Sequence, residues 1–153
     1  MTAFELVQEV SNIATAIGVG IAAWQLAHSR QQAQSAFEDS FTEQYRRILG
    51  QMPLDALLGA PLSEDELKQS LRAFYEYFDL SNEQVFIGRR GRFRAERWAN
   101  WQEGIRRNMA RPAFRQAWAK LLPTLDGSFD GLRELIQEPP RDPSAPRRAL
   151  DAS

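Results

Sequence analysis

Large apolar side chains recur at helical spacing along the first third of the chain. Between residues 37 and 48 four of them follow one another at intervals of four and three: Phe37, Phe41, Tyr45 and Ile48. This spacing places side chains on one face of an α-helix. No proline occurs before Pro53, and Gly50 is suited to end a helix. The pattern predicts one long helix from about Phe4 to Leu49.

The next helix is predicted to begin at a capping box. Ser63 is followed by Glu66 three residues later, so that each side chain can bond to the other residue's backbone N–H. The apolar stripe behind this start contains Leu67, Leu71, Phe74 and Phe78. We expect the sequence "DLSNEQ" to interrupt the helix, because Ser81 and Gln84 repeat the capping pattern.

Three further helices are predicted towards the C-terminus. The first follows Gly91 and carries a strongly aromatic face, Pro112 suits the first turn of the second, and the third extends from Ser128 to Gln137. The expected core consists of Phe74, Phe78, Trp98, Trp101, Ile105, Phe114 and Trp118. Both indoles of Trp98 and Trp101 should be largely buried. No segment alternates with a period of two, so the sequence predicts an all-α fold.

An uncharged stretch lies inside the predicted long helix. Residues 10–29 contain no Asp, Glu, Lys or Arg, and twenty helical residues are about 30 Å long, the thickness of the hydrocarbon core of a bilayer. Its apolar side chains would favour insertion by about 2 to 4 kcal/mol. We expect a membrane span that includes Val10, Ile13, Ile17, Gly18, Ile21 and Trp24. The alternative is a soluble bundle whose first helix packs in the core or in a homodimer.

The charges on either side of this stretch predict its orientation. Glu5 and Glu9 precede it, whereas Arg30, Arg46 and Arg47 follow it. Because basic residues stay on the cytoplasmic side, the N-terminus should lie outside and the rest of the chain in the cytoplasm. The expected organisation is a membrane anchor over residues 1–29, a helical stalk and bundle over residues 30–137, and a proline-rich disordered tail over residues 138–153.

Small residues recur every fourth position within the uncharged stretch. Ala14, Gly18 and Ala22 fall on one helix face, the arrangement that lets two membrane helices approach closely. The pattern is compatible with a homo-oligomer or coiled coil, and equally with an ordinary face turned towards lipid.

Charge is distributed unevenly along a chain whose net charge is only −1. Residues 55–83 contain seven acids and two basic residues, whereas Arg89–Arg115 contains nine arginines and two acids. The densest part of this basic segment contains Arg89, Arg90, Arg92, Arg94 and Arg97. Three interpretations stay open: contact with anionic lipid, binding of another anion or a nucleic acid, and either internal pairing with the acidic segment Glu64–Glu83 or plain solvation.

The sequence contains no recognisable set of catalytic or metal-binding residues. There is no cysteine, and His28 is the only histidine, so thiolate metal sites, histidine-rich metal sites and Ser-His-Asp catalysis lack their parts. We therefore expect no catalytic residue, no cofactor and no metal. The string "GRRG" at Gly88–Gly91 matches the turn of a KH domain, but the sheet of that fold is missing, so we expect no nucleic-acid binding by that route.

Three strings, "YFDLSNEQ", "W..W..GI..N" and "RPAF..AW", resemble an arrangement found in bacterial proteins of unknown function. Those proteins have one N-terminal membrane helix and a small helical domain. The resemblance covers Leu6 to about Trp118 and implies no catalytic residues. The resemblance supports the membrane anchor. The uncharged stretch and the missing catalytic residues predict a single-pass protein of a bacterial inner membrane that acts through protein contacts, with lipid and an unidentified protein as partners.

Overall fold

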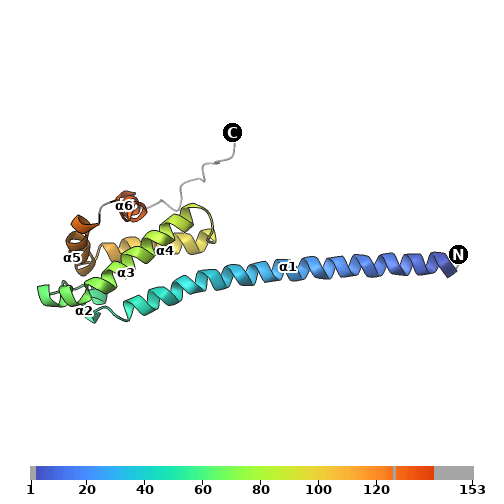
Figure 1. Cartoon of the computed structure of the whole chain (residues 1–153), viewed down its shortest axis with the longest axis horizontal. Helices are drawn as coiled ribbons and strands as arrows, with labels where there is room; N and C mark the ends of the chain where they lie inside the picture. The colour runs from blue at the N-terminus through green and yellow to red at the C-terminus, as the bar shows by residue number, and fades with distance from the viewer. Residues whose placement is uncertain (1–2, 126, 140–153) are drawn as a thin grey trace, which may run out of the picture. The chain divides into compact units, whose positions relative to one another are not determined.

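The fold is all-α, as the sequence predicts. A computed structural model describes residues 3–125 and 127–139, with side chains from residue 18 onwards, and this part of the chain contains helices and turns without strands (Figure 1). The helices are α1 Ala3–Leu49, α2 Leu54–Leu58, α3 Glu64–Arg89, α4 Ala95–Met109, α5 Pro112–Leu121 and α6 Asp130–Gln137, with a 3-10 turn, η1, at Leu122–Thr124.

The prediction of one long N-terminal helix is confirmed. α1 is continuous for 47 residues and ends one residue before Gly50, whose N–H bonds to the carbonyl oxygen of Arg46 at 3.0 Å. The chain divides into two compact units, residues 1–42 and residues 43–153. The second unit contains the last turns of α1 and all the other helices, and we call its described part the bundle.

The capping box at the start of α3 is also confirmed. The backbone N–H of Ser63 donates to Glu66 Oε2 at 2.9 Å, and the Ser63 hydroxyl accepts from the N–H of Glu66 at 3.4 Å. The Ser63 hydroxyl also donates to Glu66 Oε2 at 2.7 Å. This bond and the one from the Ser63 N–H lower the pKa of the Glu66 carboxyl below its ordinary value, because the charged form is the better acceptor. A local pattern of four residues was sufficient to predict this helix start.

The predicted interruption at "DLSNEQ" is wrong, since α3 runs without a break for 26 residues. Ser81 and Gln84 are both buried on the packed face of α3 instead of capping a new helix. Asn82 also lies within the continuous helix, and its Oδ1 accepts a hydrogen bond from the N–H of Leu132 in α6 at 3.1 Å. Packing against other helices therefore overrides the local capping preference.

The short segment after α1 contains the helix α2. Ala56 is fully buried, whereas Leu54 and Leu58 are exposed on the other side of the same five-residue helix. Gly59 ends it with a φ of 92°, a left-handed conformation that glycine adopts without steric cost.

The centre of the bundle is a cluster of aromatic rings from α3 and α5. The ring of Phe114 meets Phe74 edge to face at 5.1 Å and Tyr77 at 5.0 Å, and Phe78 meets Trp118 in the same way at 5.0 Å. Such pairs contribute about 0.5–1.5 kcal/mol each beyond the burial of their area. Phe74, Phe78, Tyr77 and Phe114 are all almost completely inaccessible to solvent.

The two tryptophans of α4 lie away from this centre, contrary to expectation. Trp98 and Trp101 are half-buried and their rings lie 6.3 Å and 4.8 Å from that of Phe93. Trp98 also covers Gly88 so closely that a Cβ there would lie 2.4 Å from the indole. Of the predicted core residues in α4, Ile105 is the one that is buried.

The C-terminal helices largely follow the sequence pattern. Pro112 occupies the first turn of α5 as predicted. The last helix begins at Asp130, two residues later than expected, after Phe129 adopts a left-handed φ of 65° with its side chain buried. Ile136 is exposed on α6, whereas Leu132 and Leu135 are buried. The predicted tail lies outside the described residues from 140 onwards.

Candidate functional site

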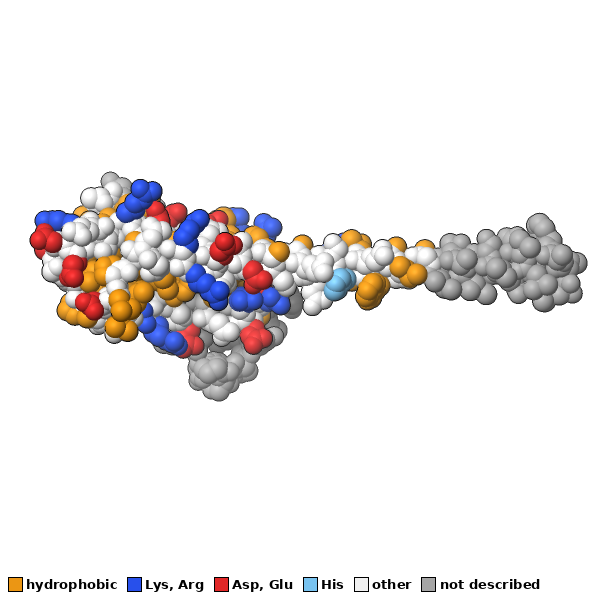
Figure 2. Space-filling view, turned by 90° about the horizontal axis from the view of Figure 1, so that it is seen from below, with side chains coloured by type: hydrophobic (Ala, Val, Ile, Leu, Met, Phe, Trp, Pro, Cys, Tyr) orange, Lys and Arg blue, Asp and Glu red, His pale blue; other side chains and the backbone are white. Residues whose placement is uncertain are grey.

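The described part of the uncharged stretch has its apolar side chains exposed. Val19, Ile21, Trp24 and Leu26 each expose more than half of their surface, and Figure 2 shows apolar side chains along this part of α1. Gly18 and Ala22 are exposed as well. The other predicted members, Val10, Ile13, Ala14 and Ile17, lie outside the residues whose side chains are described.

Two polar groups follow this apolar surface. The ring of His28 stacks on that of Trp24 with a centroid distance of 5.7 Å, and Gln32 bonds to Nε2 of the same histidine at 3.1 Å. Among the residues with described side chains, no helix combines the length and the hydrophobicity that crossing a membrane requires.

The second notable surface is the turn that joins α3 to α4. Gly91 has a φ of 68°, and its N–H bonds to the carbonyl oxygen of Gly88 at 3.0 Å, so that α3 ends in a left-handed turn. Phe93 is then buried. Because neighbouring side chains of an extended segment point to opposite sides, the burial of Phe93 turns Arg92 and Arg94 towards solvent, where both are exposed. We call residues 90–94 the basic turn.

Two aromatic side chains accompany the arginines of this region. The guanidinium carbon of Arg90 lies 3.7 Å from the ring centroid of Phe86, which is itself 53% exposed. Arg97, half-buried in the first turns of α4, lies 6.0 Å from the ring of Trp101. The Arg90 contact is within the range of a cation–π interaction, whereas the Arg97 contact is at its limit.

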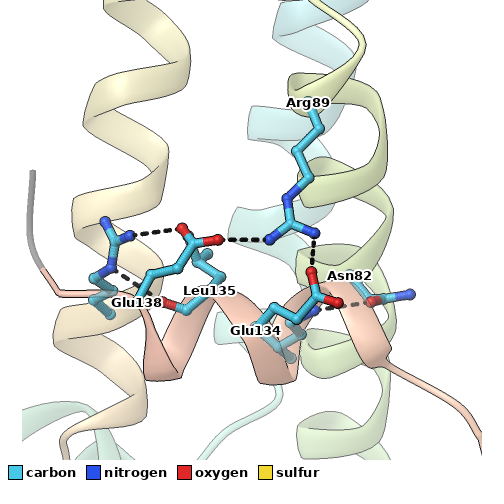
Figure 3. Close-up of polar contacts among 7 residues, drawn as sticks. Asn82, Arg89, Glu134, Leu135 and Glu138 are labelled. Atoms are coloured by element: carbon cyan, nitrogen blue, oxygen red, sulfur yellow. Dashed lines mark hydrogen bonds and ion pairs between the residues drawn. The ribbon is translucent and has the colours of Figure 1, made fainter.

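Arg89, one of the five predicted anion-binding arginines, pairs with acidic residues of the bundle. It pairs with Glu134 and, at 2.9 Å, with Glu138, while Arg106 of α4 approaches Glu138 at 3.6 Å (Figure 3). Arg106 also donates to the carbonyl oxygen of Leu135 at 3.2 Å. The internal pairing of Arg89 is thus made with α6, and Arg89 helps to hold α6 against α3 and α4.

The acidic segment has a different partner. Glu64, at the start of α3, pairs with Lys120 of α5, and the lysine lowers the pKa of the Glu64 carboxyl below its ordinary value. Arg72 pairs with Glu76 one turn further along α3 at 3.0 Å. Both pairs are exposed, and such pairs contribute only about 0–1 kcal/mol.

A buried polar cluster was missed by the sequence analysis. The side-chain amide of Asn108 donates to the hydroxyl of Tyr77 at 3.1 Å and to that of Tyr45 at 3.2 Å. Burial is the main cause that raises the pKa of Tyr77 well above its ordinary value. Asn108 lies three residues after Ile105, on the apolar face of α4, and a polar side chain at such a position was the available signal.

A groove also follows α3, with a volume of about 640 Å³. One stripe of α3 lines it, together with the start of α6: Tyr75, Asp79, Asn82, Phe86, Phe129 and Glu134. The size would suit a small molecule. The described residues include no group of three or more histidines and carboxylates placed to hold a metal ion. The groove reaches Phe86 and Arg90 at the basic turn.

Comparison of the chain with protein-family models, with curated proteins and with solved structures finds no match. The resemblance to bacterial proteins with one membrane helix therefore stays a prediction. The function has to be inferred from the two surfaces described above.

Proposed function

We propose that this protein is attached to a membrane through residues 10–29 and that its bundle acts through contacts with other proteins. The observation that carries the proposal is the exposure of Val19, Ile21, Trp24 and Leu26 in a helical stretch without charged residues. Apolar surface gains roughly 25 cal/mol per Å² when it leaves water, so an exposed stretch of this kind favours lipid or another apolar partner.

The charges around the stretch support one orientation. Arg30, Arg46 and Arg47 follow it and are exposed, and basic residues next to a span remain in the cytoplasm. We infer that the protein is a single-pass component of a bacterial inner membrane with the bundle in the cytoplasm. Trp24 and His28 would then lie where the helix leaves the hydrocarbon core, since aromatic rings prefer the interface.

Extraction of membranes tests the proposal. The full chain should remain with the membrane pellet after washing with alkaline carbonate and dissolve in detergent. Val19→Arg, near the middle of the stretch, should release it, since a central arginine costs about 3 kcal/mol. Leu58→Arg is the matched control, because Leu58 is an exposed apolar residue of the bundle. Recovery of the wild-type chain in the soluble fraction at low salt would overturn the proposal.

A second candidate is a homo-oligomer formed through the small residues of α1. It is favoured by Gly18, around whose position no side chain or backbone lies within 4 Å of an added Cβ, so another helix has room to approach there. The chain contains no cysteine, and single cysteines therefore report this contact cleanly. Ala22→Cys should form a disulfide-linked dimer, whereas Ala23→Cys, about 100° around the helix, should not.

The two candidates give different results in the same preparations. A soluble oligomer crosslinks through Ala22→Cys and stays in solution after carbonate washing. A membrane protein with a lipid-facing helix stays in the pellet and does not crosslink.

A further inference from the structure

The groove along α3 combines exposed aromatic rings with carboxylates. Tyr75 and Phe86, about three helical turns apart on α3, expose 42% and 53% of their surface. Asp79 and Asp130 are exposed members of the same lining. Neither carboxylate forms an ion pair with another side chain in the described part of the chain. A segment suited to this groove therefore combines apolar surface with positive charge.

The sequence that follows Pro139 has this combination. It reads "PRDPSAPRRALDAS", lies outside the described part of the chain, and has prolines at positions 140, 143 and 146. A spacing of three places these rings on one side of a polyproline II helix, which has three residues per turn. Arg147 and Arg148 follow directly. Proline-rich segments bind grooves lined by aromatic side chains, because their extended backbone loses little entropy on binding.

The described chain leads into this sequence beside the groove. Arg89, which belongs to the groove lining, pairs with Glu134 in α6 and with Glu138 just after it (Figure 3). Glu138 has a φ of −65° and a ψ of 132°, close to the polyproline II conformation. A residue that precedes a proline is biased towards this conformation. The chain therefore leaves α6 in an extended form next to the Arg89 end of the groove.

The lengths of the groove and of the proline-rich sequence agree. Along α3, the lining residues Arg89 and Tyr75 are about 21 Å apart. In a polyproline II helix, the seven steps from Pro140 to Arg147 cover about 22 Å. A segment that starts beside Arg89 and follows α3 thus passes Phe86 with its prolines and brings its arginines to the acidic end. The order of rings and acids along the groove matches the order of prolines and arginines in the sequence.

We propose that residues 140–148, the tail segment, dock in this groove of the same chain. The prolines would lie against Phe86 and Tyr75, and the two arginines against Asp79 and Asp130. The inference concerns the bundle and does not depend on membrane attachment. A docked tail segment would exclude a proline-rich segment of another protein from the groove, and so would control one of the protein contacts of the bundle.

Disulfide exchange tests the docking in the full chain, which contains no cysteine of its own. Ser128→Cys, in the groove lining, is combined with Ala149→Cys, just after the tail segment. In the control, Ala99→Cys, exposed on α4 outside the lining, replaces Ser128→Cys. Equilibration with glutathione in detergent solution gives the effective concentration of one thiol at the other. An undocked tail gives millimolar values for both pairs, whereas docking should raise the Ser128 pair at least about tenfold above the control.

Variants of the tail segment and of the groove decide which features matter. Pro143→Ser with Ser144→Pro keeps the composition but breaks the spacing of three, and should lower the effective concentration towards that of the control. Asp79→Asn should lower it by up to about fivefold, the size of an exposed ion pair. Glu83→Gln is the matched control, because Glu83 is an exposed acid one turn further along α3 that does not line the groove. Circular dichroism checks that every variant keeps its helices.

Three outcomes would overturn the inference. The first is an equal effective concentration for the groove pair and the Ala99 pair. The second is an unchanged value when the proline spacing is broken, or an equal effect of Asp79→Asn and Glu83→Gln. The third is a disulfide that forms mainly between two chains at low protein concentration, which would show that the tail segment binds the groove of a second copy. Carbonate extraction tests membrane attachment separately, so failure of one proposal leaves the other standing.

Discussion

Large apolar side chains are exposed in the described part of the uncharged stretch and buried at the centre of the bundle. In α1, Trp24 is 66% exposed and Val19 is 65% exposed, whereas in the bundle Phe74 and Phe114 are 0% exposed. At the centre of the bundle, apolar side chains pack against rings from helices that are distant in the sequence. The described part of the stretch leaves its apolar side chains exposed to solvent.

The two regions should therefore depend on different interactions for their stability. The bundle should unfold as a unit that depends on its ring cluster, whereas the helical stretch should depend on lipid or on another helix.

The largest effect is expected from Phe114→Ala. Phe114 touches both Phe74 and Tyr77 at the centre of the ring cluster, and truncation of such a ring costs about 3–5 kcal/mol. Trp24→Ala removes a larger ring from the exposed stretch and should change the free energy of unfolding of the bundle by less than about 0.5 kcal/mol. Denaturant unfolding, followed by circular dichroism in detergent, measures both. Similar losses in the two variants would remove the distinction between the regions.

A smaller loss is expected from Gly88→Ala, because the added Cβ would lie 2.4 Å from the indole of Trp98. Forcing a methyl group into such a contact costs about 1–3 kcal/mol. Gly104→Ala in α4 is the matched control, since nothing lies within 4 Å of the added Cβ, and it should stabilise the bundle by up to about 1 kcal/mol. Thermal melting compares the two, and a stable Gly88→Ala variant would show that the helices separate easily there.

Alkaline pH should destabilise the bundle through the buried Tyr77. Burial raises the pKa of Tyr77 in the folded protein, so its hydroxyl stays protonated where an unfolded tyrosine, with a pKa near 10, ionises. The stability that Tyr77 contributes is therefore complete below about pH 10 and is lost as the pH rises beyond it, by up to roughly 1.4 kcal/mol per pH unit.

Denaturant unfolding between pH 8 and pH 11 tests this pH dependence. Tyr77→Phe should reduce the loss at high pH, although its stability at pH 8 falls because Asn108 loses a partner. Tyr75→Phe, at an exposed position, should keep the dependence of the wild type. An identical loss in all three proteins would show that Tyr77 does not control it.

The sequence by itself determined the features that depend on neighbouring residues. The continuity of α1, the capping box at Ser63 and Glu66, and the helix start at Pro112 each follow from a few consecutive positions, and the structure confirms them. The same is true of the all-α class, because no segment of the sequence alternates with a period of two. For the candidate surfaces, the apolar stretch and the arginine cluster could be recognised from their amino-acid composition alone.

The tertiary structure determined which side chains are buried and which of them are in contact. Ser81 and Gln84 look like a cap in the sequence, yet burial on the packed face keeps α3 continuous. Trp98 and Trp101 follow the expected stripe, but α4 brings them to Phe93 rather than to the centre.

The different partners of neighbouring arginines could not be predicted from the sequence either. Arg89 and Arg90 are adjacent, yet one pairs with acids of α6 and the other covers Phe86. Local periodicity and capping are set by interactions within about one helical turn, so they can be read along the chain. Burial and pairing depend on the approach of helices far apart in the sequence, and only the assembled bundle brings those side chains together.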